Sequence, residues 1–118
     1  MATTVTAAGK DLAVTALANA GAYACLHIVN GTEVSGGSPA YARKAVTFTT
    51  TTNDGVAVLS GAVVFDVPAC TVAYVSLNSA ASGAGTEYAR AAVTNEIFAA
   101  QGTYTLTTST TITLADPA

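Results

Sequence analysis

The amino-acid sequence predicts an all-β protein, a β-sandwich or jelly-roll-like antiparallel barrel with one short N-terminal helix. Short runs of β-branched and aromatic residues alternate with polar residues along most of the chain. Turn-forming residues separate these runs at short intervals, and only the N-terminal segment repeats apolar residues at helical spacing. About six or seven strands of this length, joined by turns, are typical of a sandwich or a jelly roll.

The N-terminal segment predicts one short helix over residues 8–20, which Gly21 is well placed to end. The apolar positions at helical spacing are Leu12, Ala13, Ala16 and Leu17. Because this face is mostly alanine, the helix has little stability by itself and is suited to close packing onto a sheet.

The first predicted strand, residues 22–29, is apolar on both of its alternating faces, so we expect it to be central. Glycine, asparagine and proline then mark a loop over residues 30–39. Residues 43–52 are rich in β-branched side chains and form the next predicted strand, with Phe48 facing the core.

The strongest hairpin signal in the chain is Asn53-Asp54-Gly55, because such turns match the twist of the flanking strands. The return strand is predicted over residues 56–67, with a bulge or break at Ser60-Gly61.

Two further strands are predicted over residues 71–77 and 86–94, with a loop of small residues at 78–85 between them. We expect residues 95–101 to form a connection and residues 103–114 to form the closing segment. Threonine alternates with large residues in that segment, which gives it one wet face and one dry face. The dry face comprises Tyr104, Leu106, Ile112 and Leu114.

A chain of 118 residues has the size of one domain. We expect residues 1–118 to form a single β-sandwich domain, in which 1–21 are an N-terminal arm and the short helix, 22–114 the sandwich and 115–118 a tail.

The composition indicates a protein that hides much of its surface in an assembly. Hydrophobic residues make up 51% of the chain and charged residues only 9%, against about 25% charged in ordinary soluble domains. A monomer needs scattered charge for solubility. Threonine and serine could supply the missing polarity instead, and the two explanations are compatible.

Charge and hydropathy argue against nucleic acid and membrane as partners. The net charge is −3, and the basic residues form no extended patch. Apolar stretches stay well short of the roughly 20 residues that span a bilayer, and the N-terminus lacks the pattern of a secretory signal. We therefore expect synthesis and assembly in the cytoplasm. The basic residues are Lys10, Arg43, Lys44 and Arg90.

No pattern of catalytic or metal-binding residues emerges, so we expect neither an enzyme nor a cofactor. The one histidine, His27, lies in an apolar strand, where a core or interface imidazole is the more common role. Cys25 and Cys70 have no CxxC spacing, which argues against zinc and leaves small buried side chains or a disulfide. Among the scattered carboxylates, Asp66 and Glu87 are the only candidates for a catalytic pair across strands.

Two segments combine an aromatic residue with arginine, a combination that is frequent in protein–protein contacts. One contains Tyr41, Arg43 and Lys44, and the other contains Tyr88 and Arg90. These five residues are the candidate contact residues, although the same pattern also occurs at ordinary strand edges.

Four stretches carry a resemblance to a known family: GGSPAYARKAV at 36–46, FDVPA at 65–69, VAYV at 72–75 and AQGTYTL at 100–106. They resemble a family of small virion proteins from phages of actinobacteria, labelled tail fibre, minor tail or capsid decoration proteins. The resemblance extends over most of the chain.

The resemblance implies a non-enzymatic structural protein of the virion. The small, threonine-rich chain with few charges favours a capsid decoration or head-fibre protein that binds outside the major capsid lattice, with itself and the major capsid protein as partners. The alternative is a minor tail or tail-fibre protein that contacts the host surface or a glycan. A virion-borne glycan hydrolase is the third hypothesis, which the missing catalytic pattern disfavours.

Overall fold

Strands account for most of the regular structure in the computed structural model, which describes residues 5–50 and 55–113. The elements are α1 (Ala7–Ala20), β1 (Tyr23–Ile28), β2 (Lys44–Ala45), β3 (Phe48–Thr49), β4 (Val56–Leu59), β5 (Val63–Val67), β6 (Cys70–Asn78), β7 (Glu87–Phe98), β8 (Gly102–Leu106) and β9 (Thr111–Thr113). The expected all-β class with a short N-terminal helix is confirmed.

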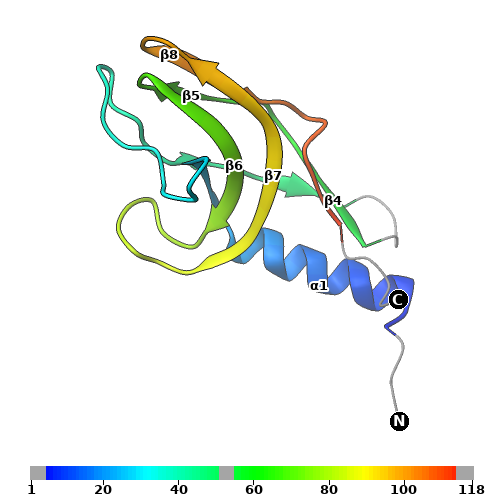
Figure 1. Ribbon diagram of the computed structural model, residues 1–118. Coiled ribbons are helices and arrows are strands. Elements are labelled where there is room, and N and C mark those ends of the chain that lie inside the picture. Colours follow the sequence, from blue (N-terminus) through cyan, green and yellow to red (C-terminus); the bar gives the residue numbers. More distant parts are fainter. Residues whose placement is uncertain (1–4, 51–54, 114–118) are drawn as a thin grey trace.

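Three antiparallel sheets surround the main core (Figure 1). Their strand orders are β2-β1-β6-β7, β3-β4-β9 and β5-β8. The long, curved strands β6 and β7 cross the view, the β5-β8 ribbon lies at one end and α1 lies at the other (Figure 1). As its two apolar faces predict, β1 is central, with β2 and β6 on either side.

Helix α1 ends before Gly21 as the sequence predicts, and it begins one residue earlier than predicted, at Ala7. The hydroxyl oxygen of Thr6 accepts a hydrogen bond of 3.1 Å from the backbone N–H of Gly9, and the N–H of Gly21 donates to the carbonyl of Leu17. The predicted apolar face is wrong, since Leu12 is exposed and Val14 and Ala18 are the buried residues. A helix this rich in alanine has no dominant face, so its orientation follows from the sheet beneath it, where Val14 and Ala18 meet Ala57.

The three longest predicted strands are each two strands in the structure, and the two strands belong to different sheets. Residues 43–52 contribute β2 to the four-stranded sheet and β3 to the three-stranded one. Residues 56–67 divide at Ser60-Gly61, as expected, and residues 103–114 divide between β8 and β9. The pairing of β3 with β4 fits the predicted hairpin, but its turn residues Asn53 and Asp54, like Leu114, lie outside the described residues.

The main core lies between the sheets, and Phe65 is its largest fully buried side chain. The ring of Phe65 stacks on that of Tyr41, with 6.3 Å between the centroids. Tyr104 and Leu106 are buried as the dry face of β8 predicts, while Phe48 is half-buried and packs against both core clusters.

Replacing Phe65 with alanine should lower the free energy of unfolding by about 3–5 kcal/mol, because it empties a fully buried site and removes the stacking partner of Tyr41. The neighbouring Val64 points outward, so Val64→Ala should change stability by less than about 0.5 kcal/mol. Urea unfolding of both variants measures the difference. Equal losses would show that β5 does not alternate as described.

Candidate functional site

The loop that follows β1 pairs along the edge of that strand, and its Glu33 carboxylate, on the outer face beside Cys25, holds the loop in place. Glu33 accepts hydrogen bonds from the Arg43 guanidinium at 2.9 Å, through both Nε and Nη2, and from the Tyr41 hydroxyl at 2.8 Å. A bidentate arginine–carboxylate pair is among the strongest side-chain contacts. The Arg43 hydrogen bonds hold the pKa of Glu33 below its usual value, while burial raises that of Tyr41.

Arg43 and Tyr41 also bind the backbone. A third nitrogen of Arg43 donates to the carbonyl of Ala80 at 2.9 Å, and the Tyr41 oxygen accepts the N–H of Leu26 at 3.0 Å. Only 9% of the Arg43 side chain is exposed. Two of the five candidate contact residues thus fasten loops to β1.

A second polar cluster lies on the same face, where β1, β6 and β7 run side by side. The ring of His27 contacts the Ser76 hydroxyl through Nε2 at 2.7 Å and the Gly31 carbonyl through Nδ1 at 2.9 Å. Arg90 forms two hydrogen bonds with Glu87, donates to the Gly31 carbonyl at 3.1 Å and lies over the Tyr74 ring. The cluster therefore links β7 across β6 to the loop after β1.

The protonation of His27 follows from its partners. The Gly31 carbonyl, at 2.9 Å, can only accept, and it lies closer to Nδ1 than the donating Arg90 nitrogen at 3.3 Å, which favours a hydrogen on Nδ1 and an Nε2 that accepts the proton of the Ser76 hydroxyl. A serine and a histidine in this relation can form a nucleophile. Here the serine is 2% exposed, so its hydroxyl is closed to a substrate.

Burial, assisted by the charge of Arg90, lowers the pKa of His27 below its usual value. The unfolded chain therefore binds a proton more readily than the folded one, and the free energy of unfolding should fall as the pH drops below about 6.5. His27→Gln should remove this dependence and leave the loss below about pH 4.5 that comes from the carboxylates. Urea unfolding at several pH values tests this, and an unchanged profile in the variant would contradict it.

Glu33→Gln should lower the free energy of unfolding by about 2–3 kcal/mol, because it leaves the nearly buried Arg43 without a carboxylate partner. The exposed Glu96 on β7 offers a matched control, and Glu96→Gln should change stability by less than about 0.5 kcal/mol. Equal effects in urea unfolding would mean that the Glu33 pair does not hold the loop.

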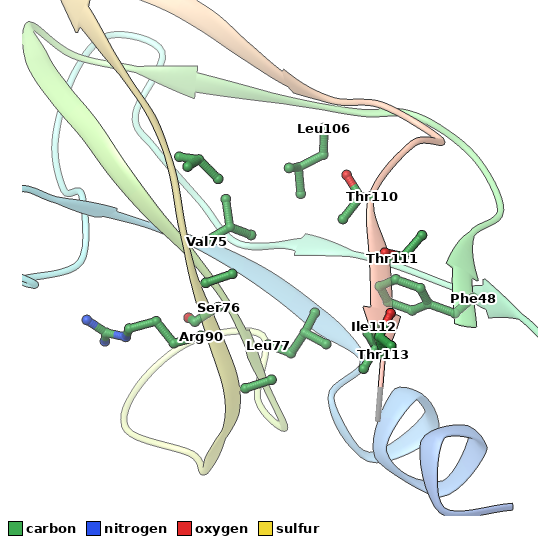
Figure 2. Close-up of a pocket in the computed structure, with 13 residues that line it drawn as sticks. Phe48, Val75, Ser76, Leu77, Arg90, Leu106, Thr110, Thr111, Ile112 and Thr113 are labelled. Atoms are coloured by element: carbon green, nitrogen blue, oxygen red, sulfur yellow. The ribbon is translucent and has the colours of Figure 1, made fainter. Parts of the chain in front are cut away.

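An apolar cavity of about 400 Å³ lies on the inner side of β6 and β7. Figure 2 shows Val75 and Leu77 on one wall, Phe48, Ile112 and Leu106 across from them, and Arg90 pointing away from the space. The cavity lies between β7 and β9, which are the end strands of their sheets. In the described chain, neither strand has a neighbour on its second edge.

Strand β7 is the most exposed long strand of the described chain. Its outward residues include Tyr88, which is 44% exposed, and Ile97, which is 78% exposed. No charged residue lies between Arg90 and Glu96. The uncharged stretch of this strand edge, residues 91–95, is a template for pairing with another chain.

The candidate contact residues do not form one surface. Tyr88 and Arg90 lie on β7, whereas Lys44 lies on β2 at the opposite edge of the same sheet. Ile97 was not among the candidate contact residues, because residues 95–101 were predicted to be a connection, whereas β7 continues to Phe98.

The structure keeps the other candidate residues apart. Asp66 pairs with Thr103 near the far end of β7, and Glu87 begins that strand, so the two carboxylates do not form a pair. Cys25 and Cys70 are free thiols, and burial raises the pKa of each. Among the described residues no group of ligands could hold a metal ion, and no helix there is long and apolar enough to cross a membrane.

Comparisons of the chain with protein-family models, curated proteins and solved structures give no match. The candidate site therefore rests on this chain's own geometry: the exposed edge of β7 and the apolar cavity beside it.

Proposed function

We propose that this chain is a non-enzymatic structural protein of a bacteriophage virion, a capsid decoration protein that binds outside the major capsid lattice. The exposed edge of β7, which carries no charge from Ala91 to Asn95, is the observation that carries the proposal. The resemblance of residues 36–46 and 100–106 to small virion proteins suggests that the assembly is a phage virion.

The apolar cavity supports an assembly role in a second way. It lies beside β7 and is lined mainly by apolar side chains of β6, β7 and β9. An apolar surface next to an unpaired strand edge favours association, since a partner buries both at once. In the assembled particle, this surface would be buried against a neighbouring subunit.

The low charge fits the same role. With only four basic and seven acidic residues, contacts with a partner depend on apolar and backbone groups more than on ion pairs. Such contacts respond weakly to salt, because screening acts on exposed charges.

The buried pair of His27 and Ser76 supports a structural role over a catalytic one. Both ring nitrogens of His27 are engaged inside the fold, and Arg90 and Glu87 lie over the pair. The cluster holds strands together in this arrangement.

The test is to mix the purified protein with phage capsids that lack it, and separately with tails, and to measure binding by pelleting and electron microscopy. We expect saturable binding at regular positions on the capsid that changes little with moderate salt. Binding only to tails would replace the capsid role with a tail role, and binding to neither particle would refute the proposal.

A matched pair of variants tests whether β7 provides the contact. Ala92 and Thr105 are both exposed strand residues, on β7 and β8 respectively. Ala92→Lys should weaken capsid binding at least about tenfold, equivalent to about 1.4 kcal/mol, while Thr105→Lys should leave it unchanged. Equal binding of the two variants would show that β7 takes no part in assembly on the capsid.

A further inference from the structure

We propose that the free edge of β7 pairs with β7 of a second copy of this chain, antiparallel and around a two-fold axis, so that the two four-stranded sheets become continuous. The inference rests on the proposed role of β7 as an assembly surface and names the partner of that surface.

An irregularity in the pairing of β6 with β7 makes β7 complementary to itself. In its first half, Ala89 and Ala91 lie opposite Leu77 and Val75 on the inner face. Tyr88 lies at a second register shift, between Ala89 and Glu87; it is 44% exposed and joins neither the core nor the inner cavity, so it lies on the outer face. Near the end of β7, Glu96 pairs with the core residue Val72. The inner face of β7 therefore carries odd-numbered residues in the first half of the strand and even-numbered residues near its end.

The change of phase occurs where the register between β6 and β7 shifts, between Val72 and Tyr74 on β6. Ile97 is therefore on the outer face, opposite Thr71, although it is nine positions from Tyr88. In a regular strand, residues separated by an odd number lie on opposite faces. The bulge thus brings the two large exposed apolar residues of β7 to one face.

With Tyr88 and Ile97 on one face, an antiparallel pairing of two β7 strands around a two-fold axis can place them opposite each other. If Tyr88 of one copy lies opposite Ile97 of the other, the symmetry creates the same pair a second time, as in any isologous interface. Aromatic and β-branched residues are a favourable cross-strand pair. In the same register Ala89 lies opposite Glu96, and both residues belong to the inner face.

The charges of β7 are compatible with this register. Arg90 falls opposite Asn95 and Glu96 opposite Ala89, so no like charges meet. Glu87 is already neutralised by Arg90 within its own copy, at 2.8 Å. The centre of the pairing, from Ala91 to Thr94, is uncharged.

The area of the contact predicts a weak dimer. Twelve residues at about 3.3 Å each give an edge of about 40 Å, and a sheet is about 10 Å thick. The two copies together then bury about 800 Å², below the roughly 1,200–2,000 Å² of stable complexes. The pair should form at high concentration, or where a lattice holds two copies close together.

Sedimentation velocity of the purified full chain, without capsids, tests the inference from about 10 μM to about 1 mM, the range of a weak complex. We expect a concentration-dependent shift from monomer to dimer. Ile97→Lys should weaken the dimer at least about tenfold, and Val64→Lys, at an exposed aliphatic residue of β5, is the matched control. A monomer throughout, or equal effects of the two variants, would overturn the inference.

The register is tested by exchanging the apolar pair for a charged one. Tyr88→Glu alone should weaken the dimer as Ile97→Lys does, because each variant loses both apolar pairs. The double variant Tyr88→Glu/Ile97→Lys should associate again, more strongly at low salt, since each new glutamate then faces a lysine of the other copy. If the double variant stays as weak as the single ones, the register is wrong.

The dimer and the proposed virion role can be refuted independently of each other. A chain that binds capsids but stays monomeric retains the decoration role and loses the two-fold pairing. A chain that dimerises through β7 but binds neither capsids nor tails retains the pairing and loses the virion role.

Discussion

Burial of β1 on both faces is the constraint on which the rest of the structure depends. Its inner residues join the core, and its outer residues Cys25 and His27 are buried as well. A strand of this kind needs cover on its outer side. Here Glu33 and Arg43 cover Cys25, and Arg90 and Glu87 of β7 cover His27, while the loop after β1 pairs along the edge of the strand. The Glu33 carboxylate, held by Arg43 and Tyr41, satisfies the polar groups that this loop brings inward.

The polar contacts on the outer face of β1 also explain why the central part of β7 has no charged side chains at its edge. Arg90, one of the four basic residues of the chain, turns back over the sheet toward Glu87, Tyr74 and the loop after β1. Charges that could have shielded the edge of β7 are thus used within the fold. Charged residues on an edge strand are a common protection against pairing with other chains, and the central part of β7 has none.

The spacing of neighbouring residues predicted those features of the fold that depend on local sequence alone. The end of the helix, the central position of β1 and the dry face of β8 depend on the spacing of neighbouring residues, and all three were correct. The buried face of α1 was wrong, because only the sheet beneath it selects Val14. The contact between His27 and Ser76 joins residues 49 positions apart, and no spacing in the sequence indicates it.

The end of β7 was missed for a different reason. Asn95 and Glu96 interrupt the apolar alternation and resemble the start of a loop, whereas in the structure they follow a change of phase in a continuing strand. A bulge inserts residues without ending the pairing, so strict alternation underestimates the length of a bulged strand. The bulge thus conceals both the length of β7 and the common face of Tyr88 and Ile97.

The bulge also limits how two copies can meet. A register centred on Val93 would place Arg90 opposite Glu96, which is favourable in charge, but the first residue points outward and the second inward. Registers centred on Arg90 or on Glu96 would bring like charges together, which destabilises a cross-strand pair. The register that pairs Tyr88 with Ile97 matches face and charge on either side of the bulge. At its centre, Ala92 and Val93 lie on opposite faces, so the bulges of the two copies must realign the strands there. An edge strand that carries such a bulge can therefore stay open to one specific partner while disfavouring indiscriminate association.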